Sequence, residues 1–322
     1  MGVIEKYKRP LLIGLLIGFA ITIGLLVFAD IREVSTVFRA MDLRYLPLIL
    51  ILAPLNYIFR FIKWNYYLNI SGIAPETKMN RYIFMSGLSM TITPAKIGEL
   101  LKCYLLKEHV NAPVSKTTSI VMAERITDGI SMVILATLGS IAYPYGKIVI
   151  PVSTALLLVL LTIFHVEPLF KYISNLLLNI EFHFIQKSVA FLIDFQRSAK
   201  KLFSTRNLLF AVLIGVISWG FEGLIVYLTV KALGGEISVL GSLFVVSLSA
   251  LIGALSFIPG GLGVTEGSIM ALLMLTGIGK EMAAAATVIT RFSTLWLGVS
   301  VGIVGLILTN SEFARAGKKV TL

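Results

Sequence analysis

The sequence predicts an all-α, polytopic integral membrane protein, because it combines an apolar composition, long apolar segments and breaks inside those segments. Of its 322 residues, 57% are hydrophobic and 14% are charged, and its mean hydropathy is +0.91. Soluble domains carry about 25% charged residues. The apolar segments repeatedly reach the ~20 residues that a helix needs to cross a bilayer. They are continuous and do not alternate with polar residues, which argues against a transmembrane β-barrel.

The first half begins with an expected anchor helix over 11–29 and a polar, interfacial stretch over 30–44. A first repeat is expected over 45–142. It opens with a spanning segment, 45–68, and continues with two segments of about 12 residues on either side of Pro94. Each of these two is too short to cross, so we expect a re-entrant hairpin. The repeat closes with a charged segment, 117–142, that is long enough to span.

The second half has a matching order of segments. A linking span and amphipathic helices on the cytoplasmic face are expected over 148–206, where apolar residues recur at helical spacing among charged ones. A second repeat is expected over 207–308, with a hairpin-like pair of segments, 238–258 and 262–277, around Pro259. The sequence leaves open whether this pair spans fully or re-enters. A basic tail, 309–322, completes one transmembrane domain.

Two helix breaks can be superimposed on each other, which predicts an internal repeat. TPAKIGE around Pro94 and IPGGLGVTE around Pro259 share the pattern Pro-x3-Gly, and a glutamate follows each. Arg125 lies 31 residues after the first proline, and Arg291 lies 32 after the second. Lys and Arg favour a cytoplasmic N- and C-terminus by nearly three to one over the opposite side. With this orientation the two repeats have inverted topology, each with a re-entrant or broken helical hairpin.

The breaks themselves are candidate functional sites. In hydrocarbon an unsatisfied peptide group costs several kcal/mol, so a helix breaks only where its backbone faces protein or a wet cavity. The alternative is that the glycines only permit close helix packing. The helix-breaking residues are Pro94, Gly98, Pro259, Gly260, Gly261, Gly263 and Gly267.

Charged residues inside membrane segments are rare and are candidates for function. Arg125 and Arg291 lie one per repeat beside the breaks, and arginine grips phosphate in a bidentate manner, so we expect them to bind an anionic phosphate headgroup. Three glutamates, Glu99, Glu222 and Glu266, would balance charge, carry protons or contact sugar or amine groups. The alternative is structural: Glu124 or Asp128 pairs with an arginine, and Lys102 reaches the membrane surface. The expected substrate-binding set is Arg125, Arg291, Glu99, Glu266, Lys96, Glu124, Asp128 and Glu222.

Other chemistries lack their residues in this sequence. There is no Walker A or Rossmann motif, and the three histidines and single cysteine, Cys103, have no metal-ligand spacing. We therefore expect no cofactor, no metal and no catalytic residue. The net charge of +11 is explained by the positive-inside rule better than by nucleic acid binding. The expected partners are membrane lipids with anionic headgroups, and 167–206 offers a docking surface for a partner enzyme or a second copy.

Three motifs, PGGLGVTEG, PAKIGELLKCYLL and AERITD, resemble elements of the lysylphosphatidylglycerol synthase transmembrane-region family, also called the flippase-like domain family. The resemblance covers roughly residues 11 to 308. It implies movement of a phosphate-headgroup lipid between leaflets, and it points to the residues of the two breaks and to Glu124, Arg125 and Asp128. We expect a stand-alone member without the soluble aminoacyl-transfer domain, so the synthase activity is not carried over.

The sequence therefore predicts a lipid flippase or scramblase of the plasma membrane rather than an enzyme. Its substrate would be a phospholipid or a polyprenyl-phosphate glycolipid that crosses through a polar cavity between inverted repeats. One alternative is a secondary transporter of a small soluble anion. Another is a non-catalytic subunit, or an enzyme, of lipid-linked sugar or lipid modification.

Overall fold

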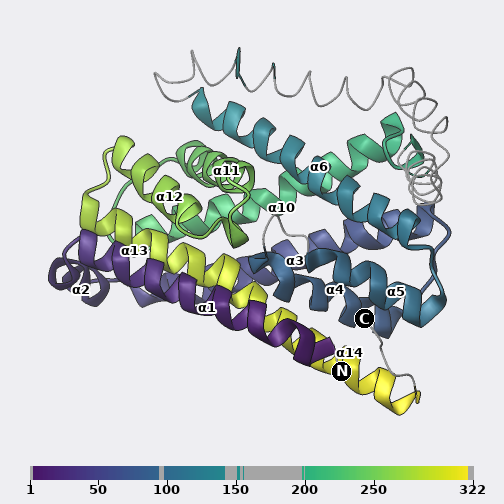
Figure 1. Cartoon of the computed structure of the whole chain (residues 1–322). Coiled ribbons are helices and arrows are strands. Elements are labelled where there is room, and N and C mark those ends of the chain that lie inside the picture. Colours follow the sequence, from purple (N-terminus) through teal and green to yellow (C-terminus); the bar gives the residue numbers. More distant parts are fainter. Residues whose placement is uncertain are drawn as a thin grey trace, which may run out of the picture.

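The computed structural model describes residues 3–93, 98–141 and 200–317, together with the positions 151–152, 155 and 198. Within these residues the chain is helical and contains no strand (Figure 1). The predicted linking span and most of the predicted cytoplasmic helices, within 148–206, lie outside the described residues. The same is true of Pro94 and Lys96.

The N-terminal helix α1 covers Val3–Phe28 and is followed by the short helix α2, Ile31–Arg39. The two are bent by 94°, and the Asp30 side chain between them accepts a hydrogen bond from the Arg32 backbone N–H. A short polar helix that leaves an apolar helix at a steep angle is suited to lie along a membrane surface. In Figure 1, α1 lies along α13 and α14 near the other end of the chain.

The next part of the chain contains one long helix on each side of a broken pair. Its elements are η1 (Leu43–Tyr45), α3 (Leu46–Ile70), α4 (Thr77–Ser89), η2 (Met90–Ile92), α5 (Leu101–Val110) and α6 (Val114–Ser140). The interruption lies between η2 and α5. With 13 residues, α4 is about 20 Å long at ~1.5 Å per residue, less than the ~30 Å of a hydrocarbon core.

The last part has the same order of long and short helices. Its elements are α10 (Thr205–Ala232), α11 (Val239–Leu255), η4 (Pro259–Gly261), α12 (Val264–Leu275), α13 (Lys280–Arg291), the π-helical turn η5 (Phe292–Trp296) and α14 (Leu297–Arg315). The π-turn begins directly after Arg291. Such single-turn bulges are rare and often occur at functional sites.

Several helices are long and apolar enough to cross a membrane, so the prediction of a polytopic all-α membrane protein is confirmed. Three continuous helical segments qualify among the described residues: Leu43–Ile70, Thr205–Ala232 and Lys280–Arg315. A fourth is obtained if the bent pair α1 and α2 is counted as one span. The segments on either side of the second break, Val239–Leu255 and Pro259–Leu275, are shorter apolar helices.

The helices pack as three main pairs, α3 with α10, α4 with α14 and α6 with α11. At the α3–α10 contact, Asn56 Nδ2 donates to the Ser218 carbonyl oxygen at 2.9 Å. The rings of Phe59 and Phe221 meet edge to face with centroids 5.4 Å apart.

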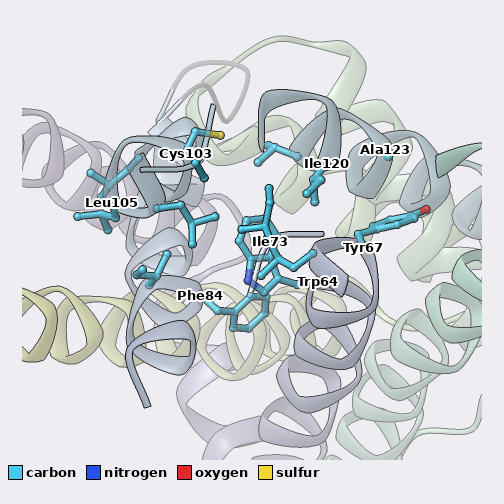
Figure 2. Packing of buried hydrophobic residues seen from close by; sticks show 14 of the residues in the cluster. Trp64, Tyr67, Ile73, Phe84, Cys103, Leu105, Ile120 and Ala123 are labelled. Atoms are coloured by element: carbon cyan, nitrogen blue, oxygen red, sulfur yellow. The ribbon is translucent and has the colours of Figure 1, made fainter. Parts of the chain in front are cut away.

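A separate apolar cluster joins α3, α4, α5 and α6 (Figure 2). Trp64, Phe84, Leu105 and Ile120 contribute one side chain from each helix. This cluster holds the first broken pair against the two long helices around it.

The α4–α14 contact depends on glycine. A Cβ atom at Gly302 would lie 2.0 Å from the Ser89 backbone nitrogen, and one at Gly305 would lie 2.4 Å from the Met85 Cβ atom. Small residues allow backbones to approach closely in membrane proteins, where van der Waals packing drives helix association. The two helices therefore meet at a distance that any side chain at Gly302 would prevent.

We predict that Gly302→Ala destabilises the protein by about 1–3 kcal/mol, since an added methyl group would collide with backbone. Thermal unfolding of the purified protein in detergent would show this as a lower midpoint. Gly24→Ala is the matched control, because a Cβ atom at Gly24 would have no neighbour within 4 Å. Equal midpoints for the two variants would contradict the proposed tight contact.

Candidate functional site

The described site residues form two clusters, one beside each break. Glu99, Glu124, Arg125 and Asp128 belong to the first, and Glu266 and Arg291 belong to the second. Each arginine contacts the glutamate that follows the break in its own half. No ion pair among the described residues joins one cluster to the other.

Arg125 on α6 is held by two carboxylates. Its Nη2 lies 2.7 Å from Glu99 Oε2, and its Nη1 lies 3.8 Å from Asp128 Oδ2. The side chains of Glu99 and Asp128 are buried, at 3% and 2% exposure, whereas that of Arg125 is 22% exposed. The arginine is thus the accessible member of an otherwise buried group.

Two lysines complete this cluster. Lys63 on α3 makes a short ion pair with Asp128, and Lys102 on α5 lies with its Nζ 2.7 Å from Glu124 Oε2. Lys102 Nζ also lies 4.1 Å from the centroid of the Trp64 ring, a favourable cation–π distance. The alternative that Lys102 reaches the membrane surface is wrong: its side chain is 3% exposed, because Glu124 and Trp64 stabilise its charge inside the helix cluster.

Sequence reasoning did not place Lys63 in the site, because the residue lies near the C-terminal end of a span, where a lysine usually reaches the interface. A signal was nevertheless present. Lys63 follows Asn56 by seven residues, so both lie on the same face of α3. Two polar residues on one face of a spanning helix indicate a face turned toward protein rather than lipid.

The second cluster is built on the glycine-rich break. Gly260, Gly261 and Gly263 all have positive φ angles, of 62°, 63° and 83°, which glycine adopts without steric cost. This conformation lets the Gly260 carbonyl oxygen accept a hydrogen bond from Arg291 Nη2 at 3.0 Å. The prediction that these glycines break the helix thus has a physical reason in their backbone angles.

Glu266 organises the start of α12. Its Oε2 accepts a hydrogen bond from the Gly263 backbone N–H at 2.7 Å, and its Oε1 accepts one from Arg291 Nε at 2.7 Å. A carboxylate at this position caps the helix and suits the positive end of its dipole. The Glu266 side chain is 6% exposed and that of Arg291 is 12% exposed.

Glu222 on α10 contacts α3. Its Oε1 accepts a hydrogen bond from Asn56 Nδ2 at 3.0 Å, the same amide that contacts the Ser218 carbonyl oxygen. It therefore belongs to the α3–α10 contact. Of the remaining predicted residues, Gly98 donates its backbone N–H to Thr93 Oγ1 at 2.9 Å. A Cβ atom at Gly267 would have no neighbour within 4 Å.

This arrangement suits anion binding rather than metal binding. Among the described residues no group of three or more histidine, cysteine or acidic side chains could hold a metal ion. Both arginines keep some exposure, and each is held by carboxylate or carbonyl oxygens, the same kind of acceptor that a phosphate presents. A phosphate could therefore exchange with these acceptors.

Comparisons with known proteins agree with the membrane architecture. The sequence matches the family model described as "Lysylphosphatidylglycerol synthase TM region" over residues 15–302. It is 26% identical to "UPF0104 membrane protein PH1989" of Pyrococcus horikoshii, covering 95% of this chain and 98% of that protein. It is 22% identical to a UPF0104 membrane protein of Methanothermobacter thermautotrophicus, with 94% and 95% coverage.

A third relative, "UPF0104 membrane protein MJ1078" of Methanocaldococcus jannaschii, is 27% identical over 71% of this chain and 97% of its own length. These relatives are membrane proteins by description, as the helices of this chain also indicate. Since the family model extends over most of the sequence, the protein belongs to the family of the lysylphosphatidylglycerol synthase transmembrane region.

Proposed function

We propose that the protein is a lipid flippase or scramblase that moves a phosphate-headgroup lipid between leaflets. The observation that carries the proposal is the pair of glutamate–arginine contacts, Glu99–Arg125 and Glu266–Arg291, each beside a helix break. Ionisable residues inside membrane segments are rare, and they mark substrate and ion pathways. The substrate would be a phospholipid or a polyprenyl-phosphate glycolipid, and its tail would stay in the bilayer. The expected location is the plasma membrane, with both termini cytoplasmic.

An inverted repeat would provide the pathway, and helix packing supports it. If α3, α4 and α6 correspond to α10, α11 and α13–α14, the contact of α4 with α14 corresponds to that of α11 with α6. Both contacts are extensive. The α3–α10 contact would then lie on the pseudo-two-fold axis. Its partners Asn56 and Ser218 are separated by 162 residues, as are Phe59 and Phe221.

The helix ends give independent support for the repeat. The Ile73 backbone N–H bonds the Leu68 carbonyl oxygen after α3, and the Gly235 N–H bonds that of Val230 after α10. Both bonds close the same kind of C-terminal cap, with Gly72 and Gly234 at positive φ. These pairs are also 162 residues apart. In transporters with inverted repeats, substrates bind near the midplane where broken helices meet.

The two arginines suggest how a headgroup is passed along. A phosphate that reaches Arg125 or Arg291 competes with the glutamate for the guanidinium group, since both are oxygen anions that accept its hydrogen bonds. The displaced glutamate then needs a proton or another cation. Lipid movement is therefore expected to be passive or coupled to an ion gradient.

We predict that Glu99→Gln with Arg125→Met folds but transfers lipid at least tenfold more slowly than wild type. Arg125→Met alone leaves a buried carboxylate without its partner, a loss of about 3–5 kcal/mol, and the second substitution removes that carboxylate charge. The measurement is dithionite quenching of fluorescent phosphatidylglycerol in proteoliposomes, with thermal unfolding in detergent as the control for folding.

Two results would contradict this assignment. A double variant that transfers lipid at the wild-type rate would make Arg125 a structural partner of Glu99 only. Wild-type proteoliposomes that transfer no fluorescent phospholipid and no polyprenyl-phosphate analogue, but accumulate radiolabelled phosphate, would replace the lipid transporter with a transporter of soluble anions.

A second prediction concerns Arg291. Its Nε and Nη2 reach two different acceptors, and a lysine ammonium has no such fork. We expect Arg291→Lys to keep the charge and the fold but to reduce lipid transfer about tenfold or more. Arg315→Lys on the same continuous helix is the matched control, because the Arg315 side chain is 75% exposed. Unchanged transfer by Arg291→Lys would show that charge alone suffices.

A further inference from the structure

The inner face of α3 carries a stripe of residues at alternating spacings of four and three. A 4-3 spacing keeps side chains on one face of a helix. Five of its six members are buried and the sixth, Arg60, is partly exposed. The stripe consists of Ile49, Ala53, Asn56, Arg60, Lys63 and Tyr67.

Arg60 occupies the middle of this stripe and yet retains access to solvent. Its neighbours four residues before and three residues after it, Asn56 and Lys63, are each 1% exposed. A partly accessible side chain between two buried ones shows that the neighbouring helices do not cover Arg60 fully. Lipid contact does not explain this exposure, because the stripe faces α6 and α10.

The carboxylates of the first cluster are already paired with other cations, and Glu222, which acts on Tyr57 together with Arg60, accepts a hydrogen bond from Asn56. Lys63 pairs with Asp128, Lys102 with Glu124, and Arg125 with Glu99. Arg60 forms no ion pair with any residue in the described parts of the chain. Asp128 is close enough to interact with its charge, but that carboxylate is engaged by Lys63 and Arg125.

The C-terminal end of α3 is out of reach of the Arg60 side chain. Arg60 lies ten residues before Ile70, the end of α3, which is about 15 Å along the helix axis at ~1.5 Å per residue. This is farther than an arginine side chain extends. A guanidinium stays charged in proteins and is costly inside the membrane unless anions stabilise it, so a phosphate bound directly to Arg60 would be favourable.

We propose that Arg60 is the primary phosphate-binding residue of the transport path, where a phosphate oxyanion binds without displacing a protein carboxylate. The inference rests on the proposed lipid transport and names the residue that receives the headgroup. Arg125 and Arg291 then act after Arg60, because each must first release its glutamate. The ligand chemistry is a phosphate oxyanion, carried by a lipid or free in solution.

Binding to the purified full-length protein tests this directly. The probes are dihexanoyl phosphatidylglycerol, dihexanoyl phosphatidylcholine and glycerol 3-phosphate, measured by calorimetry below their micellar concentrations. We expect wild type to bind the anionic lipid more tightly than the zwitterionic one, and Arg60→Gln to weaken anionic lipid binding about tenfold or more. Arg44→Gln is the matched control, since Arg44 stands just before α3 and its side chain is 89% exposed; this variant should bind as wild type does.

A chemical rescue separates the charge of residue 60 from its effect on folding. Cys103 is the only cysteine and is fully buried. In a Cys103→Ala background, Arg60→Cys can be modified with aminoethyl methanethiosulfonate, which restores a cation, or with methyl methanethiosulfonate, which does not. We expect only the first reagent to restore anionic lipid binding and transfer, and bound phosphatidylglycerol to slow the modification.

The outcomes distinguish the two proposals. Wild-type lipid transfer with unchanged lipid binding by Arg60→Gln would overturn the role of Arg60 and leave the transporter intact. Recovery with the neutral reagent would overturn it as well. Glycerol 3-phosphate binding as tight as that of phosphatidylglycerol, without transfer of any lipid, would overturn the lipid function and make Arg60 a site for soluble phosphate.

Discussion

The absence of water in a bilayer core constrains this protein more than any other factor. A charge that is left alone there costs several kcal/mol, and a buried pair is tolerated only with close geometry and further hydrogen bonds. The first half meets this condition with three cation–carboxylate pairs that connect α3, α5, α6 and the segment after the first break. Removing one partner would leave a charge that the surrounding apolar cluster cannot stabilise.

The two halves meet the same constraint by different chemistry. The first break is surrounded by Lys63, Lys102 and Asp128, in addition to its glutamate–arginine pair. The second uses backbone: glycines at positive φ turn the Gly260 carbonyl oxygen toward Arg291, and Glu266 caps α12. Arg125 is thus held by side chains, whereas Arg291 is held partly by the backbone.

Sequence reasoning found the breaks, the helices and the arginines, because these depend on local patterns. Proline, glycine and runs of apolar residues act within a few positions of themselves. The pairing of charges depends on helix rotation and on contacts between distant segments, as between Lys63 and Asp128, which are 65 residues apart. A single sequence carries no measure of such contacts. For this reason Lys63 was missed and the surface position considered for Lys102 was wrong, although both residues were visible as charges in apolar segments.

The proposed transport also requires a cation that is not already held tightly by a protein carboxylate. An arginine that is held by a glutamate can bind an incoming phosphate only if the phosphate replaces the carboxylate. The displaced carboxylate then lies in the membrane interior, which solvates charge poorly. A cation such as Arg60, which forms no close ion pair with a described residue, would attract the headgroup without that penalty. Such a cation would also release the headgroup again, since a single guanidinium binds a phosphate less tightly than two binding sites together do. In the proposed path, Arg60 therefore receives the headgroup, and the arginines that are held by glutamates pass it on.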